Sequence, residues 1–318
     1  MYNQDIKGRF MWDCEDTIGR GSVAYNAYKR LFELSSPLEE KSGKDLAAFD
    51  SDGFTRYETL IDEGSWRLPT MRYRACMLRY LDWCRSHTDI DVSKGTDHIL
   101  DGLSEYKNSI VSGPIHLQVS LDKIFPPVDS ETPDVLFRCF LWMAFAGARP
   151  KQFAGSIMVE DVDIKNRVFF YNGDTYPIYP QALEAFDRVI KANEFICDHP
   201  NYTCISKQDR VSSNKFLRGV KADADSVWLM EGVKRKTRSA HDKDPEAKRL
   251  SYRSVMHSGL FYRQYEAEAA GLDVDFAYLI KESGNYTGGR LTTRRAAINA
   301  ELKDEYYVWK YLMFKDKV

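Results

Sequence analysis

The stretch PDVLFRCFLWMAFAGARPKQFAGSIMVEDVDI, residues 133–164, decides the fold. Its first part, 133–146, is almost continuously apolar and stops at Gly147, a common helix terminator. A helix this apolar belongs inside a core, and it is too short to cross a membrane, which takes roughly 20 apolar residues. Arg149 follows at once, and an arginine is seldom buried without a partner. We therefore expect Arg149 to meet either a carboxylate or a phosphate.

After this helix the sequence changes to strand spacing. Residues 159–164 and 167–171 predict two short strands, and 175–179 predicts a third after the turn signal Asn172-Gly173-Asp174. Helical spacing returns over 180–196. The predicted fold class is mainly α with a small antiparallel β-sheet (α+β), the sheet being inserted between helices.

The N-terminal part is predicted to be helical. Residues 1–20 are polar and indicate an irregular arm, whereas 22–34, 54–63 and 96–111 have helical spacing, and Ser35-Ser36-Pro37 predicts a stop after the first of these. The clearest helix follows Thr70, a candidate N-cap. It has one apolar face, and the arginines around the rest either form a solvated surface or contact phosphate: Arg72, Arg74, Arg79 and Arg85.

The C-terminal part alternates between helical and polar segments. Two prolines and a polar cluster make 115–132 the best linker candidate. Helices are expected over 212–220, 250–270, 274–281 and 292–314. The run 234–249 holds seven lysines and arginines against three acidic residues. We expect it to be either a solvated loop or a contact to DNA backbone.

Composition bounds the class of protein. The 318 residues carry a formal charge of −2, so any DNA-binding surface must be local. The six cysteines contain no CxxC pair, which indicates buried free thiols in a reducing compartment. The N-terminus has no apolar leader segment, and no stretch is apolar enough to span a membrane. These features predict a cytoplasmic protein without membrane partners.

Two segments resemble the tyrosine recombinase (phage integrase) family. The sequence from Ala144 to Arg149, with the strand at 159–163, resembles the first arginine box, in which a helix ends in Thr-Gly-Leu-Arg and leads to a strand. Residues 69–83 resemble the start of the main helix of the core-binding domain. The resemblance covers most of the chain after Phe54. It implies an N-terminal arm or helical extension (1–53), a helical core-binding-like DNA-binding domain (54–125) and a recombinase-like catalytic domain (126–318).

The resemblance also implies a chemistry. A tyrosine oxygen would attack a phosphodiester and form a covalent phosphotyrosine, without metal or cofactor. Arg149 and Arg253 would clamp the non-bridging oxygens. The family's His-x-x-Arg pattern is Leu250-Ser251-Tyr252-Arg253 here, so its histidine is missing. The candidate nucleophiles are Tyr286 and Tyr307. The candidate proton donors are His257 and Lys165.

Each candidate also has an ordinary structural explanation. Arg149 could satisfy carbonyls at the helix end, and Arg253 could pair with a local acid. The tyrosines on the closing helix could pack, and His257 could be a satisfied helix histidine. The basic residues expected on double-stranded DNA, beyond those of the Thr70 helix, are Lys234, Arg235, Lys236, Arg238, Arg290 and Arg294.

The resemblance therefore predicts a site-specific recombinase or integrase of a mobile element, which cuts and rejoins DNA as a homo-oligomer on its target. Two alternatives remain open. The first is a catalytically inactive DNA-binding relative of the same fold, which the missing histidine allows. The second is an unrelated helical protein in which Arg149 is structural.

Overall fold

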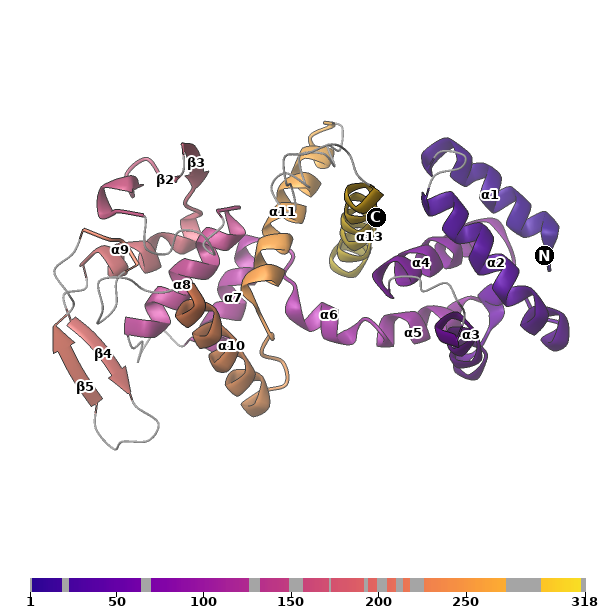
Figure 1. The fold of residues 1–318 in the computed structure, drawn as a ribbon, viewed down its shortest axis with the longest axis horizontal. Helices are drawn as coiled ribbons and strands as arrows, with labels where there is room; N and C mark the ends of the chain where they lie inside the picture. The colour runs from indigo at the N-terminus through magenta and orange to yellow at the C-terminus, as the bar shows by residue number, and fades with distance from the viewer. Residues whose placement is uncertain are drawn as a thin grey trace. The chain divides into compact units, whose positions relative to one another are not determined.

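The computed structural model describes residues 2–18, 23–63, 70–125, 132–148, 157–171, 173–191, 194–198, 205–209, 214–217, 226–272 and 293–315 (Figure 1). The chain forms two compact units. Unit 1 comprises Met1–Glu105 together with Thr287–Val318, and unit 2 comprises Tyr106–Tyr286. The expected boundary lay at residue 125, with the closing helix in the second domain. The compact units instead divide after Glu105, and the closing helix belongs to unit 1.

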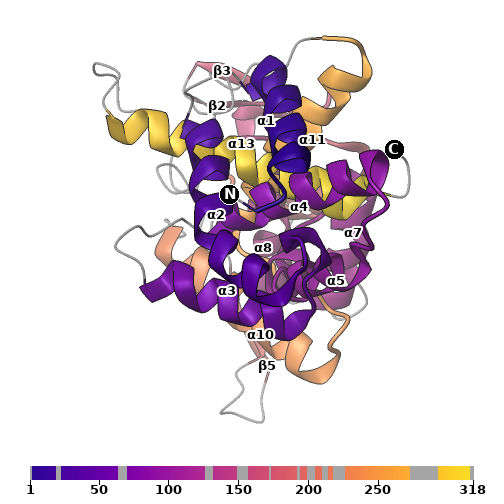
Figure 2. The same cartoon turned by 90° about the vertical axis from the view of Figure 1, so that its right-hand side faces the viewer.

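Unit 1 is helical. Its elements are α1 (Gln4–Ile18), α2 (Val23–Ser42), the 3₁₀ turn η1 (Leu46–Ala48), α3 (Ser51–Glu63), α4 (Thr70–His87), α5 (Ser93–Asp101) and α13 (Thr293–Phe314). The helix α6 (Ser104–Ser109) contains the boundary between the units. The last helix, α13, packs on α4 and α2, as the second view shows (Figure 2).

The predicted N-terminal arm is instead the helix α1, and it supplies part of the core of unit 1. Phe10 is buried and meets Tyr28 and Tyr80 edge-on, with ring centroids 5.0 and 5.1 Å apart. The charged residues on the rest of α1 hid this apolar stripe from the sequence analysis. The helix α2 also runs past the predicted stop: it contains Pro37 and ends at Ser42.

In unit 2 the predicted linker is largely a helix. The segment contains α7 (Pro114–Ile124), in which Pro114 starts the helix at a position where its missing N–H costs nothing. Leu117 and Leu121 are buried in the core, and Arg138 of the next helix donates to the carbonyl of Phe125 at 2.6 Å. The helix predicted over 96–111 is split into α5 and α6 at Gly102 and Leu103.

The apolar helix is α8 (Thr132–Phe145), and it forms the centre of unit 2 as predicted: the described side chains from 134 to 146 are all buried. The 3₁₀ turn η3 (Val159–Asp161) precedes β1 (Val162–Asp163), and β2 (Val168–Tyr171) and β3 (Asp174–Pro177) complete an antiparallel sheet. Phe169 is paired with Val162 on one side and Tyr176 on the other. The predicted fold class, mainly α with a small antiparallel sheet, is therefore confirmed.

The remaining elements of unit 2 are η4 (Pro180–Ala182), α9 (Leu183–Lys191), β4 (Glu194–Asp198), β5 (Ile205–Asp209), α10 (Ser226–Lys243) and α11 (Tyr252–Ala269). The antiparallel hairpin of β4 and β5 was not predicted. The helix expected over 212–220 is not present in its described part, because Lys215 forms an isolated bridge with Met158. The expected helix over 274–281 lies outside the described residues.

Two expectations about the whole chain can be compared with the described residues. The described cysteines, Cys14, Cys76, Cys84 and Cys139, are buried thiols outside any disulfide, as predicted. Burial raises the pKa of Cys14 to about 11 and the pKa of Cys76 to about 12, so neither thiol is activated. Within the described parts of the chain, no helix has the length and apolar character that a bilayer crossing requires.

Candidate nucleic-acid interface

The basic run expected as a loop is in fact mostly the helix α10. Leu229, Val233 and Thr237 are buried on one side of this helix and fix its orientation. Lys234, Arg235, Arg238 and Lys243 then lie on the exposed side. The prediction missed the helix because its apolar positions are few and its basic residues are many.

The exposed side of α10 forms one surface hollow, whose described lining is Glu231, Lys234, Arg235, Arg238, Ser239, Asp242 and Lys243. Lys234 lies 3.7 Å from Glu231. Among the residues that the structure describes, Arg235, Arg238 and Lys243 have no ion-pair or hydrogen-bond partner. Four basic and two acidic side chains therefore leave this face positive, with three cations free to bind an anion.

Lys236 has a different role from its neighbours. Its Nζ lies 3.0 Å from a carboxylate oxygen of Asp134, which is buried in the first turn of α8. The negative charge of Asp134 also interacts favourably with the positive, N-terminal end of the α8 dipole. The structure therefore uses Lys236 to hold α10 against α8, and it is not available to DNA in this arrangement.

Arg253 lies in the first turn of α11, where the chain enters the helix through a capping box. The Ser251 hydroxyl accepts from the backbone N–H of Ser254 at 3.1 Å. Arg253 is exposed, and it has no partner in the part of the chain that the structure describes. A free guanidinium beside a helix N-terminus suits an anion. Leu250, at the position of the family's histidine, is buried in the core and offers no proton chemistry.

The end of α8, where Arg149 follows, is capped without help from that arginine. Gly147 has a φ of 102°, and the amides of Gly147 and Ala148 bond to the carbonyls of Ala144 and Met143 at 3.0 Å each. This is a Schellman motif. The Phe145 carbonyl accepts from Arg263 at 2.6 Å. Arg149 itself lies outside the described residues, but these three carbonyls already have donors.

The two candidate proton donors occupy unlike places. His257 is buried inside α11, with its ring 5.9 Å from that of Phe261 in an edge-on contact. Lys165 is exposed in the turn between β1 and β2, next to Asn166 and Arg167, whose φ is 57°. A buried imidazole cannot reach a phosphate on the surface, so the structure gives His257 a packing role.

The tyrosine candidates divide in the same way. Tyr286 lies outside the described residues. Tyr307 is half-buried on α13, with the Arg79 guanidinium 4.1 Å from its ring centre. Burial raises the pKa of Tyr307 well above its usual range, and Asp82 adds to this. A tyrosine nucleophile needs the opposite shift. Tyr306 and Tyr311 are buried and pack.

The arginines of α4, expected either as a solvated surface or as phosphate contacts, pair with acids in this structure. Arg74 donates to Glu58 at 2.9 Å and fills the space beside Gly102. Arg72 and Arg79 both pair with Asp304 of α13, at 3.0 and 3.1 Å. Arg85 pairs with Asp82 at 2.5 Å. Arg72 and Arg79 meet Asp304 because α13 packs on that side of α4.

Two residues with important contacts were missed from the sequence. Asp304 is one, although its helical spacing to Val308 and Tyr311 could have placed it on the packed side of α13. Arg263 is the other, and no local signal marks it. Arg290 lies outside the described residues, and the side chain of Arg294 is not among those described. Among the described residues, no group of three or more histidines, cysteines or acids could hold a metal ion.

A known protein family matches the first part of the chain. Residues 1–86 match the family model described as MrpR, N-terminal core-binding domain. The N-terminal part of the chain is therefore similar to a core-binding domain. This agrees with the predicted resemblance over residues 69–83. The core-binding match also includes residues 1–53, which were expected to be a separate arm or extension.

Solved structures resemble the chain at low similarity. XerA recombinase is 11% identical with a TM-score of 0.38, over 99% of both chains. Two structures of the Tn1549 transposon integrase in complex with a circular intermediate DNA are each 13% identical with a TM-score of 0.35. They cover 93% and 92% of this chain and 98% of the integrase chain. No curated protein sequence matches the chain.

Proposed function

We propose that this protein binds double-stranded DNA and that the exposed face of α10 is a principal contact to the DNA backbone. The observation that carries the proposal is the set of Arg235, Arg238 and Lys243, which share one hollow and have no partner among the described residues. Cations held on one helix face bind phosphates and release condensed counterions. The core-binding domain at the N-terminus supports the same function.

A charge-removal experiment tests this proposal. The variant Arg235→Gln with Arg238→Gln removes two phosphate contacts, and we expect weaker binding to duplex DNA at every sequence tried. The log–log slope of affinity against salt should become shallower by about 2, since each phosphate contact contributes roughly 0.9. Fluorescence anisotropy with a labelled duplex over a series of salt concentrations measures both quantities.

The matched control is Lys191→Gln with Lys107→Gln, which removes the same charge from two exposed sites outside α10. This control should leave the slope close to that of the unmodified protein. Equal losses in both double variants would show only a response to net charge and would overturn the assignment to α10. Absence of binding by the unmodified protein would remove the proposed function.

DNA strand cleavage and rejoining is the second candidate function. Arg253 favours it, because this residue is exposed, lies at a helix N-terminus and has no partner in the described part of the chain, as the second arginine of a phosphate clamp requires. The buried Leu250 and the buried environment of His257 weigh against it. We therefore place DNA binding first and strand transfer second.

A suicide substrate decides between binding alone and strand transfer. Nicked duplex DNA carrying the target site should trap a covalent protein–DNA adduct if a tyrosine attacks the phosphodiester. Tyr286→Phe and Tyr307→Phe, tested separately, would identify the nucleophile by loss of the adduct. DNA bound without an adduct would support the inactive relative. The cytoplasmic location and the homo-oligomer on DNA stay predictions.

A further inference from the structure

The carboxylate of Asp304 occupies an arginine clamp in unit 1. The Nε of Arg72 lies 3.0 Å from Oδ2, and Nη1 of Arg79 lies 3.1 Å from Oδ1. The two guanidinium groups therefore hold the two oxygens of one anionic group, one each. Residues 72 and 79 are two helical turns apart on one side of α4, so both can reach the same small anion.

This clamp has more donor capacity than Asp304 uses. The side chain of Arg72 is only 8% exposed, and its buried Nη2 has no hydrogen-bond partner in the described structure. Two guanidinium groups face one carboxylate, which leaves the cluster with a net positive charge. A phosphate offers more acceptor oxygens than a carboxylate and would satisfy such a donor set more fully.

The helix that supplies Asp304 covers the clamp. α13 packs on α4, and Val308 and Tyr311, which lie on the same side of α13 as Asp304, are buried. Tyr307 lies over the Arg79 guanidinium. Phosphate cannot reach Arg72 and Arg79 while α13 is docked, because Asp304 and the helix occupy the approach.

We propose that Arg72 and Arg79 form a second DNA-phosphate site, which Asp304 keeps covered by taking the place of the phosphate. Docking of α13 and binding of a phosphate at this clamp are then mutually exclusive. A DNA ligand that engages unit 1 displaces Asp304, and α13 is the element that moves. This inference rests on the proposed DNA-binding function and assigns a regulated site within it.

Asp304→Asn in the full chain tests the proposal, because it removes the competing charge while keeping the size of the side chain. We expect the affinity for duplex DNA to rise by about three- to tenfold, because the DNA no longer has to displace a competing charge. Adding Arg79→Gln to Asp304→Asn should reverse most of this gain and make the salt slope shallower by about 1, the loss of one phosphate contact. The matched control is Glu301→Gln, which removes an exposed charge one turn earlier on α13.

A measurement on the unmodified protein covers the case in which Asp304→Asn does not fold. Saturating duplex DNA should speed amide hydrogen exchange in residues 300–312, because the phosphate releases α13 from α4. Exchange that is unchanged or slower there, while DNA is bound, overturns the inference.

The outcomes also separate this inference from the proposed function. An unmodified protein that binds DNA, with Asp304→Asn behaving like Glu301→Gln, leaves the function standing and removes the covered site. Binding by Asp304→Asn alone supports the covered site directly. No binding by either protein removes both.

Discussion

Arg263 of α11 donates a hydrogen bond from Nη1 to the carbonyl oxygen of Phe145, the last residue of α8, over 2.6 Å. With the Schellman bonds at Gly147 and Ala148, this contact completes the end of the central helix. Arg149 lies outside the described residues, and its place in a phosphate clamp stays a prediction.

Arg263→Gln should destabilise unit 2 by about 1–3 kcal/mol, because a partly buried carbonyl loses a charged donor. Urea unfolding followed by circular dichroism gives the free energy. Lys191→Gln is the control, since Lys191 is exposed and its pair with Asp187 is an ordinary surface contact of α9. Its expected cost is below about 1 kcal/mol. Equal costs in the two variants would contradict the capping role of Arg263.

Gly259→Ala should be severely destabilising. A Cβ at this position would lie 1.9 Å from the backbone oxygen of Phe145, and backbone cannot swing aside as a side chain can. We expect the free energy of unfolding to fall by at least about 1–3 kcal/mol, the usual cost of overpacking a core. Gly8→Ala on the exposed side of α1 has open space around it and should stabilise by about 0.5–1 kcal/mol. Thermal melting of both variants checks the pair, and a tolerated Gly259→Ala would refute the close α8–α11 contact.

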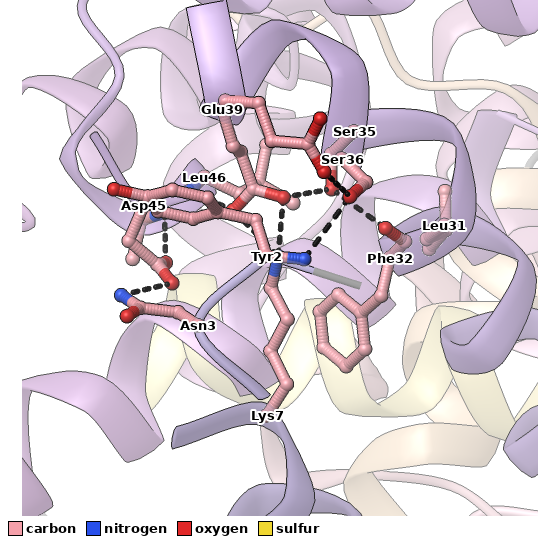
Figure 3. A network of polar contacts seen from close by, with 12 residues as sticks. Tyr2, Asn3, Lys7, Leu31, Phe32, Ser35, Ser36, Glu39, Asp45 and Leu46 are labelled. Carbon is pink, nitrogen blue, oxygen red and sulfur yellow. Dashed lines mark hydrogen bonds and ion pairs between the residues drawn. The ribbon is translucent and has the colours of Figure 1, made fainter. Parts of the chain in front are cut away.

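Lys7→Met should be costly, because it leaves a buried carboxylate without its cation. Lys7 and Glu39 are fully buried and paired, and Glu39 also accepts from the Leu46 amide at 2.7 Å and the Ser35 hydroxyl at 2.7 Å (Figure 3). Breaking such a pair costs about 3–5 kcal/mol. Adding Glu39→Gln should recover much of this loss. A double variant no more stable than Lys7→Met would show that lost packing, and not the unpaired charge, is responsible.

Stability should fall as pH is lowered through the titration of His116. Its Nδ1 accepts from the Ser112 amide at 3.2 Å, so the imidazole is neutral at that nitrogen. Burial lowers the pKa of His116 below its usual value, and the charge of Lys248 adds to this. In the unfolded chain the imidazole takes up a proton at about pH 6.5, whereas in the folded chain it does so only at lower pH. The stabilisation is therefore present above that pH and is lost as pH falls through the folded pKa.

Unfolding free energies of the unmodified protein and His116→Gln, measured between pH 7.5 and 5, check this expectation. The amide oxygen of the glutamine can still accept from Ser112, and it does not titrate. The loss of stability on acidification should be smaller in the variant. Parallel curves for the two proteins would mean that another group is responsible.

Local signals in the sequence were sufficient for the centre of unit 2. The apolar run to Ala146, the terminator Gly147 and the alternation around Phe169 predicted α8 and the three strands, because each signal acts within a few residues of itself. The family match likewise agrees with the segment after Thr70. These features depend on backbone preference and burial of one face, which a single sequence records.

The errors occurred where distant contacts decide the outcome. The pairing of Arg72 and Arg79 with an acid was not predicted, because Asp304 is more than 200 residues away in the chain. The stripe of α1 around Phe10 and the helix after Lys234 were obscured by charged residues at the other positions. The roles of Arg149 and Tyr286 stay predictions, as do those of Arg290 and Arg294.

The make-up of unit 1 sets the order in which it can be completed during synthesis. Its first segment ends at Glu105, and its second begins at Thr287. At about 5–20 residues per second, the ribosome needs roughly 10–40 s to add the intervening chain. During that time Arg72 and Arg79 have no Asp304, and the side of α4 that receives α13 is open. The newly made protein therefore passes through an interval in which this clamp is accessible to any polyanion nearby, including nucleic acid.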